Sequence, residues 1–136
     1  WHINSLWNTD TYIHTSLNDS MKKILLYSSD FVMSFSFLMF LQNRYSITLT
    51  TDIKDFELIS KNTHFDIILM DAEPTIETES ICRNIQHITT IPVILLYVYR
   101  NEFKEFDKKI RKYVKAIFYK PFDILEVKNT LDLLTV

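Results

Sequence analysis

Two segments decide the fold, KKILLYSSD at residues 22–30 and FDIILMDAEP at residues 65–74, because each is a short apolar run that ends in polar residues. IPVILLY at residues 91–97 and AIFYKPF at residues 116–122 are further runs of this kind. Longer segments with helical periodicity separate the runs, which is typical of successive βα units on a parallel sheet. We therefore predict an α/β fold with strands near residues 24–27, 46–50, 65–70, 93–97 and 114–119, and helices between them.

The helix after the fifth strand is the best marked by the sequence. Asp123 and Glu126 have the spacing of a capping box, and an apolar stripe follows that should face the sheet: Ile124, Val127, Leu131 and Leu134. The second helix is expected to begin near Asp52, and the third to end before Pro92, since proline favours an extended backbone in the residue before it.

The first helix, at residues 31–41, has apolar side chains all round, because only Ser34 and Ser36 are polar. We expect one face to pack on the sheet and the other to need a protein cover, since the segment is too short to span a bilayer. The predicted inner face consists of Phe31, Phe35, Leu38 and Met39. The predicted outer face consists of Met33, Phe37, Phe40 and Leu41.

The chain is expected to divide into an N-terminal extension, residues 1–20, and one domain, residues 21–136. Met21 resembles a natural start, so the extension is interpreted as an addition or as the end of an upstream region. It is rich in large apolar residues, including Trp1, Leu6 and Trp7. Either this segment or a second subunit is therefore a candidate cover for the first helix.

Composition excludes several classes of function. Fifteen basic and 17 acidic residues give a net charge of −2, so no overall field attracts nucleic acid or an anionic membrane, and we expect neither as a partner. The chain contains no glycine, which rules out a P-loop, a dinucleotide fingerprint and a nucleophile elbow. The single cysteine, Cys82, cannot form an internal disulfide, which indicates a reducing, cytoplasmic location.

Polar residues that could carry chemistry follow the predicted strands directly. Ser28, Ser29 and Asp30 follow the first strand, Asp71 the third, and Lys120 the fifth, while Tyr97 ends the fourth. In an open parallel sheet, the functional crevice lies beyond these carboxyl ends. A carboxylate and a lysine that meet there can position a phosphate or form a structural ion pair, and the spacing does not choose between these roles.

In their order and spacing, the four quoted segments resemble those of bacterial response-regulator receiver domains, over residues 21–134. The resemblance implies a flavodoxin-like fold, in which helices cover both faces of a five-stranded parallel sheet of order 2-1-3-4-5. It also implies an aspartate that accepts a phosphoryl group from a histidine kinase with the help of magnesium. On this basis Asp71 occupies the phosphoacceptor position and Lys120 the phosphate-sensing position, joined to Pro121 by a cis peptide bond.

The sequence departs from the family pattern where magnesium would bind. Ser28 and Ser29 stand in place of an acidic pair, and only Asp30, in the next position, is acidic. Asp30 and Asp71 would therefore form a weak magnesium site, because this cation is usually held by one or two carboxylates with waters and phosphate oxygens. The alternative for Asp30 is an ordinary helix N-cap.

The switch positions that the resemblance implies are also changed. Tyr97 replaces the threonine or serine whose hydroxyl follows the phosphate, and its bulkier ring could reach towards Asp71 or simply pack in the interior. Ile117 stands at the position of the switching aromatic residue on the fifth strand. These departures favour a pseudo-receiver, with Asp71 and Lys120 left as a possible structural pair.

We therefore expect a receiver-like domain of two-component phosphorelay signalling that is impaired in phosphorylation. It is expected to act by protein contact and not as an enzyme, with no cofactor or with weakly bound Mg²⁺. Its partner would be another protein, a histidine kinase being one candidate, or a second copy. Contact would use the first helix, or the face formed by the fourth helix, fifth strand and fifth helix. The alternatives are a functional receiver phosphorylated at Asp71, and an anion binder at the turn of Ser28 and Ser29.

Overall fold

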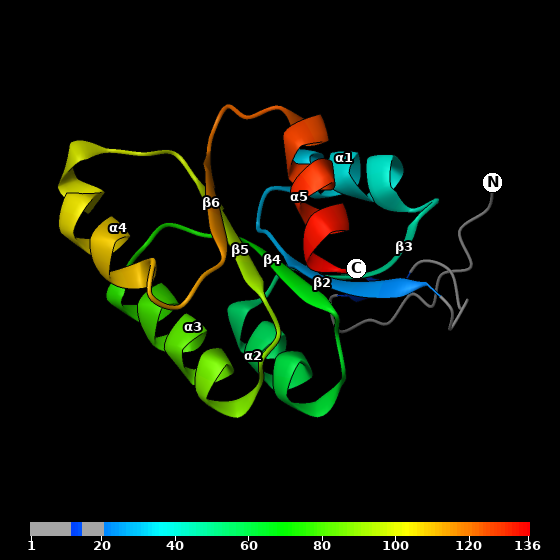
Figure 1. Cartoon of the computed structure of the whole chain (residues 1–136), viewed down its shortest axis with the longest axis horizontal. Helices are drawn as coiled ribbons and strands as arrows, with labels where there is room; N and C mark the ends of the chain where they lie inside the picture. Colours follow the sequence, from blue (N-terminus) through cyan, green and yellow to red (C-terminus); the bar gives the residue numbers. More distant parts are fainter. Residues whose placement is uncertain (1–11, 15–20) are drawn as a thin grey trace.

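A largely parallel sheet forms the middle layer of the structure, a computed structural model that describes residues 12–14 and 21–136 (Figure 1). The sheet order in this part of the chain is β1-β3-β2-β4-β5-β6. Five strands run parallel: β2 Lys22–Tyr27, β3 Tyr45–Thr50, β4 Ile67–Asp71, β5 Val93–Tyr97 and β6 Ala116–Tyr119. These five have the predicted order 2-1-3-4-5, and the prediction of the fold class is confirmed.

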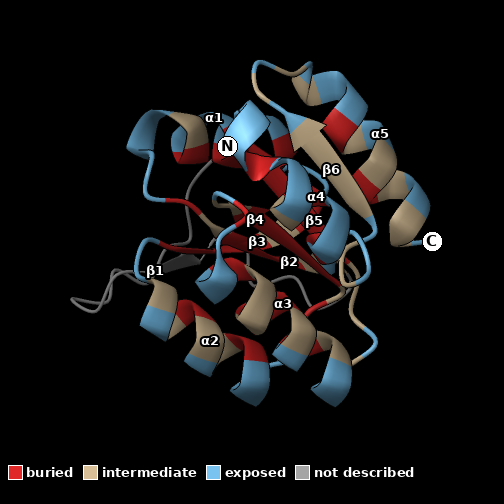
Figure 2. Ribbon diagram, turned by 90° about the vertical axis from the view of Figure 1, so that its left-hand side faces the viewer, coloured by how far each residue is buried: buried red, intermediate tan, exposed pale blue. Residues whose placement is uncertain are grey.

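Different helices cover the two faces of the sheet, because successive residues of a strand point to opposite faces. The face of Ile24 and Leu26 packs against α1 Phe31–Leu41 and α5 Ile124–Leu134. The face of Leu25 packs against α2 Ile53–Asn62 and α3 Ile76–Ile88, and against α4 Lys104–Ile110, which follows a short 3-10 turn at Asn101–Phe103. Figure 2 shows the buried strands between these two helical layers.

The helix boundaries agree with the sequence signals. Asp52 caps α2 by accepting a hydrogen bond from the backbone N–H of Lys54 at 2.8 Å, and Asp123 caps α5 through that of Leu125 at 2.9 Å. Val127 and Leu131 of the predicted stripe are fully buried against the sheet. Within the described residues, no helix is long and apolar enough to cross a membrane.

The edge strand β1 Tyr12–His14 was not predicted, and it adds a sixth, antiparallel strand to the five predicted parallel ones. β1 runs antiparallel to β3, with Tyr12 opposite Thr50. β1 pairs with backbone groups of β3 that would otherwise be unpaired at the edge of the sheet. Three residues are too short to show the alternation that marks a strand in sequence. The rest of the predicted extension, residues 1–11 and 15–20, lies outside the described residues.

The rotation of α1 about its axis differs from the prediction for most of its residues, although Leu38 is buried and Phe40 is exposed as predicted. The buried side consists of Ser34, Phe37, Leu38 and Leu41, whereas Phe31, Phe35 and Met39 are exposed. Because both sides of this helix are apolar, hydrophobic periodicity could not set its rotation. Ser34 can be buried because its hydroxyl donates to the backbone carbonyl of Asp30 at 2.9 Å. On the buried side, the Phe37 ring stacks on that of Phe122, with centroids 5.8 Å apart.

Candidate functional site

The carboxyl edge of the sheet brings together the polar residues that sequence analysis placed there. They line a cleft of about 440 Å³ between the loops that follow β2, β4, β5 and β6. The predicted candidates in its lining are Ser29, Asp30, Asp71, Tyr97 and Lys120. Ser28 lies beside it, fully buried and bonded to Asp71. Ile117 packs instead in the apolar layer under α3 and α4.

Asp71 and Lys120 form a close ion pair at this edge. The Lys120 Nζ lies 2.6 Å from Asp71 Oδ1, and the two side chains are 26% and 8% exposed. The Lys120–Pro121 peptide bond is cis, as the family resemblance implied. The pair therefore has the placement expected of a phosphoacceptor and its sensing lysine, and also the contact expected of a structural ion pair.

Ser28 is hydrogen-bonded to the second oxygen of the Asp71 carboxylate. Its hydroxyl donates to Asp71 Oδ2 at 2.7 Å, and its oxygen accepts a hydrogen bond from the backbone N–H of Asp30 at 3.0 Å. A fully buried hydroxyl needs such partners, since an unpaired one would be destabilising. Ser28 therefore ties the β2–α1 loop to Asp71, a role that its position in the sequence did not reveal.

Asp30 acts as the N-cap of α1, which was the alternative to a metal ligand. Its backbone is extended, with φ −89° and ψ 104°, and its Oδ1 accepts a hydrogen bond from the backbone N–H of Met33 at 3.1 Å. This bond occupies a donor that an anion at the helix N-terminus would use. The geometry therefore counts against the anion binder that the Ser28 and Ser29 turn suggested.

The residues of the cleft do not fit a magnesium site well. One Asp71 oxygen contacts a cation and the other accepts the Ser28 hydroxyl, while one Asp30 oxygen caps a helix. Magnesium prefers oxygen ligands in a near-octahedral arrangement, and the positive charge of Lys120 next to Asp71 opposes its binding. Within the described residues, no group of three His, Cys, Asp or Glu side chains could hold a metal ion.

Tyr97 packs in the interior and is bonded to α4. Its side chain is buried, with its ring edge-on to Phe103 and Tyr119, and its hydroxyl donates to Asp107 on α4. The second sequence interpretation, a packing aromatic, is therefore the correct one. Burial and the hydrogen bond to the Asp107 carboxylate raise the pKa of Tyr97, so that it stays a neutral donor.

Asp107 is the centre of a polar cluster that sequence analysis missed. Besides Tyr97, it accepts from the Tyr119 hydroxyl at 2.7 Å and from Arg111 Nε at 2.8 Å, and Arg111 also donates to Tyr119 at 2.7 Å. Burial opposes the ionisation of Asp107, but these hydrogen bonds outweigh it and lower the pKa of the carboxyl. The four-residue spacing of Asp107 and Arg111 was the available signal.

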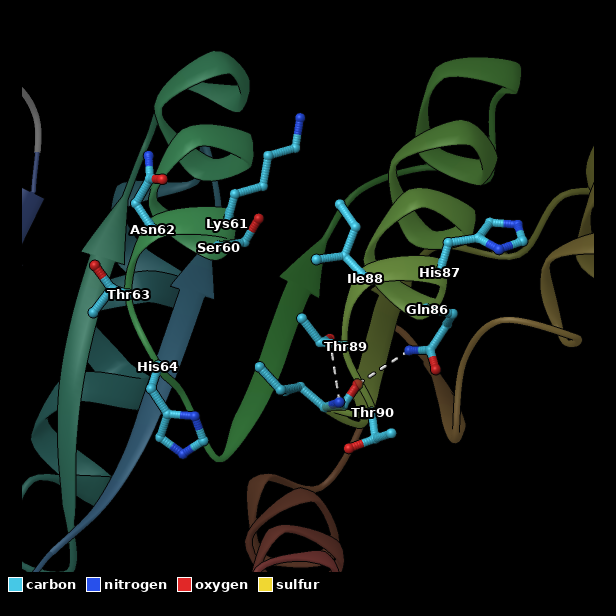
Figure 3. Close-up of a pocket in the computed structure, with 11 residues that line it drawn as sticks. Ser60, Lys61, Asn62, Thr63, His64, Gln86, His87, Ile88, Thr89 and Thr90 are labelled. Atoms are coloured by element: carbon cyan, nitrogen blue, oxygen red, sulfur yellow. Dashed lines mark hydrogen bonds between the residues drawn. The ribbon is translucent and has the colours of Figure 1, made fainter.

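A second hollow, of about 610 Å³, lies near the opposite edge of the sheet, between the ends of α2 and α3 (Figure 3). Its lining includes His64, Gln86 and Thr89. Gln86 Nε2 donates to the Ile91 carbonyl at 3.0 Å, and the Ile91 N–H donates to the Thr89 hydroxyl at 3.3 Å. These polar groups bind their own loop, so the smaller cleft around Asp71 remains the candidate site.

Comparison with known proteins identifies the fold. No family model and no curated protein sequence matches the chain. Among solved structures, the receiver domain of a sensor histidine kinase from Pseudomonas aeruginosa, determined with a magnesium ion in its active-site cleft, matches with a TM-score of 0.69 and 22% identity. The match covers 85% of this chain and 98% of that chain.

Two other neighbours have the same fold. A two-component response regulator from Clostridium difficile has a TM-score of 0.71 and 18% identity, covering 84% of this chain and 95% of its own. A streptococcal redox sensor, described as evolved from two-component response regulators, has a TM-score of 0.74 and 15% identity, covering 84% of this chain and 51% of its own. The chain therefore has the flavodoxin-like fold of response-regulator receiver domains.

Proposed function

We propose that this chain is a receiver-type domain of two-component signalling whose phosphorylation is impaired and which acts by contact with other proteins rather than by catalysis. One observation carries the proposal: each carboxylate oxygen of Asp71 already has a partner within the protein. Lys120 contacts one oxygen and the Ser28 hydroxyl donates to the other. The family resemblance assigns Asp71 to the phosphoacceptor position, and its location at the carboxyl end of β4 in a receiver-like fold supports this assignment.

The contacts of Asp71 bear directly on phosphoryl transfer. An Asp71 oxygen would form the new O–P bond while the bond between phosphorus and the donor breaks, and the negative charges that meet need a cation. Lys120 supplies one positive charge. Ser28 is neutral, and its hydroxyl donates to a lone pair of the Asp71 carboxylate. A carboxylate at position 28 would instead attract Mg²⁺. Transfer to Asp71 is therefore expected to be slow, and magnesium to bind weakly.

The alternative is a functional receiver in which a histidine kinase phosphorylates Asp71 with weakly bound Mg²⁺. The observation in its favour is the open cleft, where Asp71 and Lys120 lie together. In either case the partner is a protein or a second copy. The candidate surfaces are α1 and the face formed by α4, β6 and α5. On the second surface, the hydrogen bond from Tyr97 to Asp107 holds α4 against the sheet.

The deciding experiment measures the intact mass of the protein after incubation with a small phosphodonor and Mg²⁺. We expect no added phosphoryl group in the natural sequence and partial addition in the Ser28→Asp, Ser29→Asp variant, since these changes restore the ligand charge. Asp71→Asn in both backgrounds is the matched control for attachment elsewhere. Stoichiometric, Asp71-dependent phosphorylation of the natural sequence would replace the proposal by the alternative.

A further inference from the structure

The outward side of α1 is an apolar surface for which the described fold provides no cover. We call it the α1 face and define it by five side chains that are 41% to 75% exposed: Phe31, Val32, Phe35, Met39 and Phe40. Phe31 and Phe35 lie one helical turn apart with their rings stacked, centroids 6.2 Å apart. The face therefore forms a continuous stripe along the helix rather than scattered residues.

The size of the α1 face is that of an interface. With about 150 to 250 Å² for each fully exposed aromatic side chain, the exposed fractions correspond to roughly 500 Å² of mostly apolar surface. A patch of this size is at the upper end for a monomer surface and is often functional. Two such faces would together bury about 1,000 Å², the lower bound for a specific protein interface.

The composition of α1 favours a second copy of the chain as the occupant. No residue from Phe31 to Leu41 is charged, so helices paired across a two-fold axis bring no like charges together. A two-fold interface must be complementary to itself, which an uncharged apolar stripe satisfies. Aromatic and methionine side chains with few charges are also the residues enriched in interface cores.

We propose that two copies of this chain associate through their α1 faces in a two-fold symmetric dimer. Ser36 lies on the exposed side of the same helix, near its middle, so it is a suitable position for testing contact between the two faces. The dimer extends the proposed function by naming one contact surface. It does not depend on the chemistry of Asp71, so either idea can fail without the other.

The first test is sedimentation of the full chain at about 1 to 100 micromolar, the range suited to an interface of this modest area. The natural sequence should become a dimer within this range. The Val32→Glu, Phe35→Glu variant should weaken association at least tenfold, because it places like charges on both copies. Leu58→Glu is the matched control, since Leu58 is an equally exposed apolar residue on α2, and this variant should still dimerise.

Disulfide trapping provides a second measurement that does not depend on the charged variants folding. The single natural cysteine, Cys82, is buried, so an introduced surface cysteine is the reactive thiol. Mild oxidation should link two chains with Ser36→Cys or Met39→Cys but not with Leu58→Cys, because a disulfide needs Cα atoms about 4.4 to 6.8 Å apart.

Three results would overturn the proposal. The first is a monomer throughout this range together with no trapping on α1. The second is a dimer that the charged variant leaves intact, which would place the interface elsewhere. The third is a monomer that dimerises only when residues 1–11 are removed, which would assign the face to the chain's own N-terminal segment.

Discussion

Asp107→Ala should be among the most destabilising changes of a polar residue on α4. The Asp107 side chain is 9% exposed and accepts hydrogen bonds from Tyr97, Tyr119 and Arg111. Arg111 is about half exposed and Tyr119 is partly exposed, so water can replace Asp107 for both at little cost. Tyr97 is buried, and its hydroxyl would lose its partner.

The expected loss in the free energy of unfolding is about 2 to 4 kcal/mol. An unpaired buried hydroxyl contributes about 1 to 3 kcal/mol, and the lost charge-assisted bonds, reduced for solvent exposure, contribute the rest. Tyr97→Phe removes the same donor and should cost about 1 to 2 kcal/mol. The double variant should therefore cost at least about 1 kcal/mol less than the sum of the two single variants.

Urea unfolding followed by circular dichroism measures these differences for the natural chain, the two single variants and the double variant. Glu105→Ala is the matched control on the same helix, because Glu105 is 75% exposed and should change stability by less than about 0.5 kcal/mol. Two results would contradict this prediction: a cost of Asp107→Ala no larger than that of Glu105→Ala, or effects of the two single changes that simply add.

Three further outcomes are expected. Hydrogen bonds from Lys128 and Tyr45 lower the pKa of Asp132, and the contacts described above lower that of Asp107. The stability that these carboxylates provide is therefore present above their ordinary pKa of 3.8 and is lost as the pH falls through the lower folded-state values. Urea titrations from neutral pH downward should show this loss, and the loss should be smaller in Asp107→Asn. Calorimetry should detect weak Mg²⁺ binding to the natural chain and tighter binding to the Ser28→Asp, Ser29→Asp variant, and beryllofluoride should not fix a distinct state of the natural chain. Burial raises the pKa of the Cys82 thiol to about 12, so iodoacetamide at pH 8 should label Cys82 only after unfolding, as mass spectrometry would show.

The sheet could be predicted from sequence because buried parallel strands have a strong local signal. Each run of apolar residues is long enough to cross the core, and the polar residue that ends it marks the carboxyl edge. The same signal placed Asp71 and Lys120 together, since residues that follow parallel strands meet at one edge whatever lies between them. The two side chains meet at that edge, 2.6 Å apart.

Other features depend on contacts that sequence periodicity does not contain. The rotation of α1 is set by the buried Ser34 and by the stack of Phe37 on Phe122, an aromatic residue 85 positions further along the chain. The direction of the Tyr97 side chain is set by Asp107, which belongs to a charged segment that resembles a solvated helix face. In both cases a polar group is buried with its partner, and sequence patterns register burial only for apolar residues.

Ser28 and Tyr97, two departures from the family pattern, have the same kind of effect. Ser28 donates to Asp71, and Tyr97 donates to Asp107, so each brings a hydroxyl that is satisfied inside the protein. A phosphoryl group or cation that binds Asp71 Oδ2 competes with the Ser28 hydroxyl, and displacing that hydroxyl would leave a buried donor without a partner. Movement of α4 must likewise break the Tyr97 contact. Both the cleft and α4 are therefore held in one arrangement by bonds that need no ligand, which is the physical basis for proposing a domain that signals by contact.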